Sequence, residues 1–432
     1  MEFGDRPQGL PAKSRAVVDA GLKSRKLGVR FPGRLLDLSK SRVSLPSMSP
    51  RFNPVFADLP VTVFETMSRL ARETGAINLG QGFPDGPGPA DVRAKAAEAV
   101  VDGWNQYPPM MGLTELRAAA AAHYARWQGL DLDPDAEVMV TSGATEALAG
   151  ALFALVEPGD EVVLLQPMYD AYLPLALRAG ATPRFVKLSP PDWRLDEAAL
   201  KAAIGPRTKA VLLNNPLNPA GAVYGRETLE AVARAVEGTD VVVISDEVWE
   251  HVTFDGAAHV SALGVEGLKD RTVKIGSAGK IFAMTGWKVG LVCAPPPLMG
   301  ALSKAHQYLT FTTPPNLQAA VAYGLGKEDA WFHAMRAGLQ AKRDRFAEGL
   351  ASAGFKALPT QGTYFLNIDL APLGVTDDVA FCARLAREGG VVAIPLSAFY
   401  AEDKVTTVAR FCFAKDDAVL DAALERLGRF LR

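Results

Sequence analysis

One lysine of this sequence lies in a turn whose neighbours suit it for chemistry. Lys280 ends the segment Gly276-Ser-Ala-Gly-Lys280, which follows the apolar run Val273–Ile275. Small and apolar neighbours remove water from an amine, which lowers its pKa and makes it nucleophilic toward a carbonyl carbon. A nucleotide P-loop is excluded, because Lys274 and Ile281 stand where that pattern requires glycine and serine or threonine. Lys280 alone indicates a reactive amine without identifying the reaction.

Two further segments place polar groups after apolar runs. The run Val138–Val140 leads into Thr141-Ser-Gly-Ala-Thr-Glu-Ala, where a strand, a turn and a helix present free N–H groups to an anion. The same residues also serve as an ordinary helix cap. Asp246 follows the run Val241–Ile244 and either caps the next segment or pairs with a buried cationic nitrogen. An anion cradle, a strand-end aspartate and a lysine beside a serine are together the parts that a pyridoxal cofactor needs.

The elements that must position these groups alternate along the middle of the chain. Short apolar runs separated by helical stretches predict a mostly parallel sheet covered by helices on both faces. In such sheets ligands lie at the carboxyl ends of the strands. The expected strands are Val138–Val140, Glu161–Leu165, Ala210–Leu213, Val241–Ile244 and Val273–Ile275, and the helices between them include Glu146–Val156 and Arg226–Val236.

The chain divides into four expected parts. Residues 1–50 are rich in basic residues but keep four acids, which is unlike a transit peptide, and they read as a disordered extension ahead of a start at Met48 or as a structured arm. Residues 51–89 are expected to form an N-terminal arm or small-domain segment. Residues 90–313 are expected to form a large cofactor-binding domain. Residues 314–432, with the long helix Trp331–Ala353 and strands near Phe365–Ile368, Val391–Ile394 and Val408–Phe413, are expected to form a small α+β domain.

The composition argues against several other classes of protein. A formal net charge of −2 gives no general attraction to nucleic acid or to an anionic membrane. Three cysteines and five histidines, all scattered, indicate neither a disulfide framework nor a metal centre. No apolar run approaches the roughly 18 residues that a membrane helix needs. We expect a cytoplasmic enzyme without a metal.

A series of short motifs carries a resemblance to a known family. They are NLGQGFPD, NQYPPMMG, TSGATEAL, NNPLNPAG, SDEVWEH, KIGSAGKIFAMTGWKVG, GTYFL and ARFCFAK. In this combination the chain resembles the class I aminotransferases of fold type I, which depend on pyridoxal 5'-phosphate (PLP). The resemblance runs from about Asn53 to the C-terminus. It is closest to the branch of kynurenine, glutamine and methionine aminotransferases and some succinyldiaminopimelate aminotransferases.

The resemblance implies a role for each matching residue. Lys280 would carry PLP as a Schiff base and, once released, move the proton at the substrate α-carbon. Asp246 would pair with the cofactor's ring nitrogen, and Asn218 would bind the ring oxygen and help hold the substrate. Gly82, together with Asn218, would help hold the substrate, and Arg410 would bind the substrate α-carboxylate.

The remaining implied roles concern the cofactor and a second subunit. Tyr169 would stack on the ring. Tyr107 would reach the phosphate in the neighbouring subunit, so a homodimer is implied. The residues implied to bind the phosphate within the same chain are Ser142, Gly143, Ala144, Ser277 and Lys288.

One residue departs from the family pattern. Trp249 stands where the family usually has the tyrosine that binds the ring's phenolic oxygen, and an indole N–H donates but cannot accept a hydrogen bond. Trp249 therefore either supplies the same donor or leaves Asn218 to act alone.

The activity that the resemblance implies is transfer of an amino group from an L-amino acid to a 2-oxo acid. The resemblance implies an aromatic, sulfur-containing or glutamine-like donor. A succinyldiaminopimelate-type aminotransferase and a C–S β-lyase on the same scaffold remain alternatives. A non-catalytic PLP-binding regulator would need a DNA-binding domain ahead of this fold, and the first fifty residues are too short and irregular for one.

Overall fold

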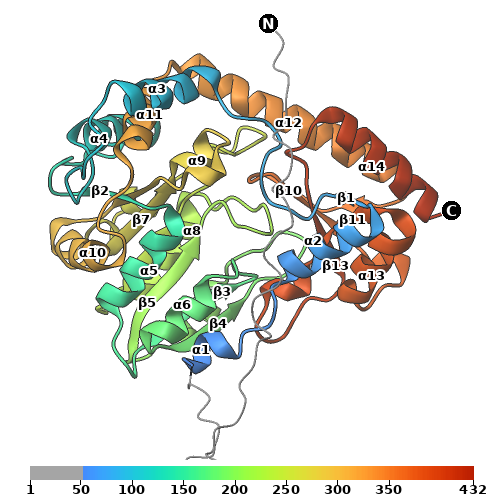
Figure 1. Cartoon of the computed structure of the whole chain (residues 1–432). Helices are drawn as coiled ribbons and strands as arrows, with labels where there is room; N and C mark the ends of the chain where they lie inside the picture. Colours follow the sequence, from blue (N-terminus) through green and yellow to red (C-terminus); the bar gives the residue numbers. More distant parts are fainter. Residues whose placement is uncertain (1–51) are drawn as a thin grey trace, which may run out of the picture. The chain divides into compact units, whose positions relative to one another are not determined.

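The computed structural model describes residues 52–432 (Figure 1). The predictions for residues 1–50 concern a segment outside the described residues. Residues 53–432 form one compact unit. The division of this unit at residues 89/90 and 313/314 remains a prediction. None of the described helices combines the length and apolar character needed to cross a membrane.

A seven-stranded sheet forms the centre of the unit. All of its strands run parallel except β8, which is antiparallel to both of its neighbours. In spatial order the strands are β2 (Val138–Thr141), β8 (Gly290–Cys293), β7 (Thr272–Ser277), β6 (Val242–Asp246), β5 (Thr208–Asn214), β3 (Glu161–Gln166) and β4 (Thr182–Lys187).

Successive residues of the strands enter different apolar clusters, which shows that both faces of this sheet are covered. Val162 and Leu164 of β3 pack with residues of α5 and α6, whereas Val163 and Leu165 pack with residues of α7 and α8. Figure 1 shows α5 and α6 lying across one face. The covering helices are α4 (Thr114–Gln128), α5 (Ala144–Leu155), α6 (Tyr172–Ala179), α7 (Glu197–Ala203), α8 (Arg226–Val236) and α10 (Pro296–Leu309).

The remaining strands form two smaller sheets. An antiparallel sheet has the order β12 (Ile394–Pro395), β13 (Val408–Cys412), β10 (Phe365–Asp369) and β9 (Lys356–Ala357). A parallel pair joins β1 (Ile77–Asn78) to β11 (Val391–Val392). The other helices are α1 (Pro54–Ala57), α2 (Val63–Thr74), α3 (Ala90–Val101), α9 (Ala278–Ile281), α11 (Pro315–Leu325), α12 (Asp329–Ser352), α13 (Asp378–Arg384) and α14 (Asp417–Phe430).

The predicted α/β fold, with a mostly parallel sheet covered on both faces, is confirmed. The sequence patterns did not reveal β4 or β8. The side chains of β4 are largely exposed or half-buried, so β4 lacks the continuous apolar run of a central strand. Strand β8 follows a 3₁₀ turn at Thr285–Trp287 rather than a helix, so it interrupts the strand–helix alternation.

Candidate active site

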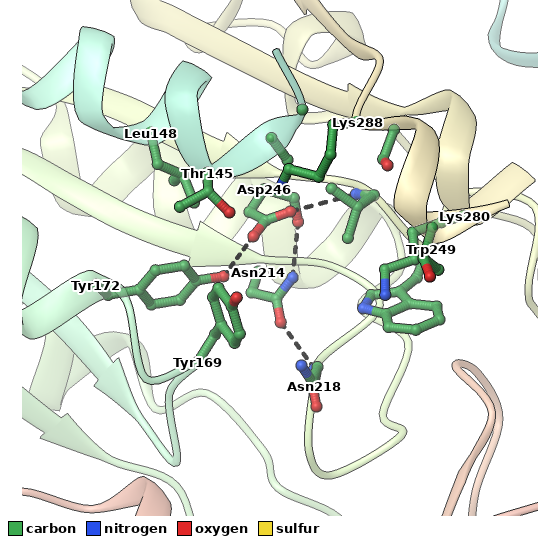
Figure 2. Close-up of a pocket in the computed structure, with 15 residues that line it drawn as sticks. Thr145, Leu148, Tyr169, Tyr172, Asn214, Asn218, Asp246, Trp249, Lys280 and Lys288 are labelled. Carbon is green, nitrogen blue, oxygen red and sulfur yellow. Dashed lines mark hydrogen bonds between the residues drawn. The ribbon is translucent and has the colours of Figure 1, made fainter. Parts of the chain in front are cut away.

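The carboxyl ends of the parallel strands meet at a cavity of about 230 Å³. The first residues of β8 reach the same edge, because this strand runs in the opposite direction. Figure 2 shows side chains from separate parts of the chain pointing into this space. The lining residues are Gly143, Ala144, Thr145, Leu148, Tyr169, Tyr172, Asn214, Asn218, Asp246, Val248, Trp249, Ser277, Lys280, Thr285 and Lys288.

One end of the cavity is built to receive an anion. Helix α5 begins after Gly143, and its first amides and positive dipole end face the cavity. Gly143 has φ 80°, and a Cβ there would lie 2.9 Å from Cε of Lys288, so a side chain would displace this lysine. Within residues 52–432 no carboxylate lies within salt-bridge distance of Lys288. Ser277, the last residue of β7, also lines the cavity.

Asp246 is a buried carboxylate at the end of β6. The hydroxyl of Tyr172 donates a hydrogen bond to its Oδ2 at 2.6 Å, and the amide of Val248 donates to Oδ1 at 3.3 Å. These two hydrogen bonds and the charge of Lys280 lower the pKa of Asp246, but burial outweighs them and raises it to about 6. A carboxylate in this position gains most from a cationic N–H donor.

Lys280 lies on α9, immediately after β7. Its amine lies 4.7 Å from the ring centroid of Trp249 and donates a hydrogen bond to the hydroxyl of Tyr364 at 3.1 Å. Burial lowers the pKa of Lys280 to about 8. The lowered pKa leaves a larger fraction of this amine neutral near neutral pH than an ordinary lysine has, and the neutral form is the one that acts as a nucleophile or base.

Aromatic and amide side chains form the walls of the cavity. Tyr169 packs edge-on against Tyr172, with ring centroids 5.7 Å apart. The indole of Trp249 is buried beside Lys280 (Figure 2). The backbone N–H of Asn218 donates to Oδ1 of Asn214 at 2.7 Å, while the side-chain Nδ2 of Asn214 donates to the backbone carbonyl of Asp246 at 2.8 Å. The Asn218 loop is thereby tied to the end of β6.

Arg410, on β13, lies next to this cavity and is 1% exposed. Its guanidinium donates to Oδ1 of Asn218 and to the carbonyl of Gly80, each at 3.1 Å, and lies 3.8 Å from the ring centroid of Phe365. No carboxylate of the described chain lies within salt-bridge distance of it, and its Nε has no hydrogen-bond partner there. Burial lowers the pKa of Arg410 to about 10. A buried guanidinium without a counterion is a binding group for a carboxylate.

The structure brings most of the predicted site residues together. Gly143, Ala144, Tyr169, Asn218, Asp246, Trp249, Ser277, Lys280 and Lys288 line one cavity. Gly82 is connected to Lys280 by way of Tyr364: its carbonyl accepts a hydrogen bond at 2.8 Å from the Tyr364 hydroxyl, which in turn accepts one from Lys280.

Two predicted residues lie elsewhere. The hydroxyl of Ser142 lies 3.3 Å from that of Thr313, outside the cavity lining. Tyr107 is 78% exposed and packs on Phe311. Their roles remain predictions.

Sequence reasoning missed Thr145, Tyr172, Asn214 and Tyr364. Asn214 and Thr145 could have been found, because Asn214 directly follows the predicted strand Ala210–Leu213 and Thr145 lies in the predicted anion cradle. Tyr172 and Tyr364 carried no such signal, since their hydroxyls reach Asp246 and Lys280 only through the folded backbone.

The fold and this site define an enzyme of the PLP-dependent fold type I. The family model for aminotransferases of class I and II matches residues 74–427. The chain belongs to this family, and it is an aminotransferase.

Curated relatives and solved structures agree with this assignment. A probable N-succinyldiaminopimelate aminotransferase (DapC) of Mycobacterium tuberculosis is 46% identical over 85% of this chain and 95% of its own length. The methionine aminotransferase of Escherichia coli is 42% identical over 85% of this chain and 96% of its own. The solved structure of N-succinyldiaminopimelate aminotransferase from M. tuberculosis matches with a TM-score of 0.85 and 45% identity, covering 88% of this chain and 100% of that one.

Proposed function

We propose that this enzyme binds PLP in the cavity at the strand ends and uses it to transfer the amino group of an L-amino acid with an uncharged side chain to a 2-oxo acid. One observation carries the proposal. The amine of Lys280, the carboxylate of Asp246 and an anion cradle at Gly143 and Lys288 all face a single cavity. Family and fold imply the same cofactor.

The residues present fit PLP in charge and shape. The α5 amides, Lys288 and Ser277 would bind the phosphate, and the buried carboxylate of Asp246 would pair with the ring nitrogen. Tyr169 supplies an aromatic surface for stacking, and Asn218 supplies an amide for the ring oxygen. When bound, PLP supplies an electron sink that makes the α-hydrogen of an amino acid acidic.

Each side chain of the site then has a defined task. Lys280 anchors the cofactor, and its free amine accepts and returns the α-proton of the substrate. Asp246 keeps the ring nitrogen protonated. Arg410 pairs with the substrate α-carboxylate, which orients the α-hydrogen toward Lys280. Trp249 forms one wall and directs its indole N–H into the cavity.

The choice of amino donor follows from the charges around the cavity. Among the residues that line it, the cations are Lys280 and Lys288, and both have tasks in cofactor binding. Arg410 is assigned to the α-carboxylate. A donor with a second carboxylate would need another cation, so we favour a sulfur-containing, aromatic or glutamine-like side chain over an N-succinylated diamino acid. Relatives of both donor classes match this chain at similar identity, 46% for the probable N-succinyldiaminopimelate aminotransferase and 42% for the methionine aminotransferase, so the preference rests on the charges around the cavity.

A half-reaction screen tests the proposal. Purified holoenzyme is mixed with L-methionine, L-kynurenine, L-glutamine or N-succinyl-LL-2,6-diaminopimelate, each without an acceptor, and the cofactor absorbance and the 2-oxo acid product are followed. We expect rapid conversion with an uncharged donor and slow conversion with the succinylated one. Faster conversion with the succinylated donor would contradict the assigned donor class. No conversion with any amino acid would contradict the proposed function.

We also propose that the enzyme acts as a homodimer in which Tyr107 completes the partner's phosphate site. Tyr107 is exposed and packs on Phe311, and Trp104 and Tyr308 are further exposed aromatic side chains of the kind that interfaces cover. Sedimentation should give the mass of a dimer. Tyr107→Phe should weaken PLP binding without changing that mass, and a monomeric, fully active enzyme would contradict the proposal.

A further inference from the structure

Tyr364 links the reactive lysine to a glycine-containing loop. Its hydroxyl accepts a hydrogen bond from the amine of Lys280 at 3.1 Å and donates one to the carbonyl of Gly82 at 2.8 Å. Tyr364 is 2% exposed, and both hydrogen bonds are partly shielded from solvent. Since its only hydroxyl proton is bound to Gly82, the phenol oxygen faces Lys280 as an acceptor alone.

The phenol ring is fixed in place before any ligand arrives. The amide of Phe413 donates to the carbonyl of Tyr364 at 3.0 Å, which ties Tyr364 to the strand segment that carries Arg410. Trp249 packs edge-on against the ring, with centroids 4.3 Å apart. The amine of Lys280 lies near both rings, at 4.7 Å from the centroid of Trp249 and 5.5 Å from that of Tyr364. The acceptor is therefore preorganised.

We propose that Tyr364 is a positioning residue for Lys280: it binds one N–H of the free amine and so directs the amine's lone pair toward the substrate α-carbon. The proposal rests on the function proposed above. A neutral amine has two hydrogens and one lone pair, so fixing one hydrogen restricts the directions open to the lone pair. Tyr364 itself gains and loses no proton.

The same loop also positions the carboxylate-binding group. Arg410 donates to the carbonyl of Gly80 at 3.1 Å, two residues before the carbonyl that Tyr364 uses. Side chains on this loop would collide with its neighbours, since a Cβ at Gly82 would lie 2.8 Å from Phe365 and one at Gly80 2.8 Å from Ile394. The loop thus holds the base and the carboxylate-binding group in one frame.

The first test measures the amine itself in the full chain freed of cofactor. The rate at which a small acylating reagent labels Lys280 is followed against pH by peptide mass spectrometry, in the wild type and in Tyr364→Phe. An acceptor stabilises the ammonium form, so its removal should lower the pKa of Lys280 by about one unit. Tyr400→Phe is the matched control, because the Tyr400 hydroxyl is also buried and donates to a backbone carbonyl, that of Leu188, at 2.8 Å. In Tyr400→Phe the amine of Lys280 should titrate as it does in the wild type.

The second test uses the holoenzyme with L-methionine as donor. Tyr364→Phe should slow the half-reaction at saturating donor about tenfold, enlarge the isotope effect of α-deuterated donor and leave KM nearly unchanged. Tyr364→His, which restores an acceptor, should recover part of the rate. The proposal would be overturned if Tyr364→Phe kept the wild-type pKa of Lys280 and the wild-type rate. It would also be overturned if Tyr364→Phe and Tyr400→Phe had equal defects. Because the amine titration needs no catalytic turnover, a failed half-reaction screen would refute the proposed function without deciding the role of Tyr364.

Discussion

Lys274 and Lys280 lie on the same segment of chain, the first fully buried and the second half-buried, and their surroundings give them opposite properties. The ammonium of Lys274 lies 2.6 Å from Glu250 and 3.2 Å from Glu247, and 4.2 Å from the ring centroid of Tyr124. Burial lowers the pKa of Lys274, but the two carboxylates outweigh burial and hold it above its ordinary value. Lys280 has aromatic neighbours and no carboxylate within salt-bridge distance among the described residues, so burial lowers its pKa to about 8.

The adjacent acids Asp246 and Glu247 show the same contrast. Glu247 receives hydrogen bonds from Ser245, Ser261 and the amide of Ala262, and it lies 2.9 Å from His259. Burial raises the pKa of Glu247, but the charges of Lys274 and His259 with these hydrogen bonds lower it to about 2. For Asp246 burial dominates. A buried charge that is fully paired is costly to leave without its partners, whereas one left short of partners is available to a ligand.

The contrast predicts that Lys280 is required for activity and not for folding. Lys280→Ala should reduce transamination by at least about 10⁴-fold, because covalent attachment and proton transfer are lost together. The resistance of this variant to urea should equal or exceed that of the wild type, since a half-buried amine without a carboxylate partner among the described residues is removed. Unfolding of the variant under native conditions would contradict this division.

Lys274 should show the reverse pattern. Lys274→Met leaves two buried carboxylates without their cation and should lower the free energy of unfolding by about 3–5 kcal/mol. Urea unfolding measures this loss, and Lys304→Met, at an exposed lysine of α10, is the control. A loss no larger than that of the control would show that the buried pair contributes nothing.

Substitutions of Asp246 and Glu247 should differ in the same way, the first affecting catalysis and the second affecting stability. Asp246→Asn should slow the half-reaction by about 10²-fold or more, because the ring nitrogen loses its counterion. Glu247→Gln should act mainly on urea stability. Comparable kinetic losses in both variants would show that Glu247 belongs to the site.

The pH dependence of stability should differ in sign for these two acids. The folded pKa of Asp246 is raised, so its contribution is present below about pH 4 and is lost as pH rises through about 6. The folded pKa of Glu247 is lowered, so its contribution is present above about pH 4.5 and is lost as pH falls toward 2. In cofactor-free protein, urea unfolding should show Asp246→Asn gaining stability relative to the wild type between pH 4 and 6. A constant difference across that range would contradict the assignment.

Trp249 should give the smallest effect. Trp249→Tyr replaces the indole N–H by a phenol hydroxyl, a stronger donor to the cofactor's ring oxygen, and should lower the midpoint of the cofactor's absorbance titration by roughly one pH unit. An unchanged titration would show that residue 249 does not contact this oxygen.

The sequence predicted Asp246 and Lys280 because each follows an apolar run, and parallel strands bring such positions to one edge. The sequence could not show that Lys274 has carboxylate partners and Lys280 has none, since the partners of Lys274, Glu247 and Glu250, lie on another segment. The position of Lys288 over Gly143 depends on the antiparallel strand β8, which the patterns did not reveal. Arg410 was identified by its motif, whereas its burial against Phe365 and its missing counterion emerge only in the fold.

Reductive trapping tests the central claim most directly. Holoenzyme is treated with borohydride, which makes the bond between cofactor and protein permanent, and the modified peptide is identified by mass spectrometry. We predict one phosphopyridoxyl group per chain, on Lys280, with Lys274 and Lys288 unmodified. Attachment to another lysine, or no attachment to a catalytically active enzyme, would contradict the account.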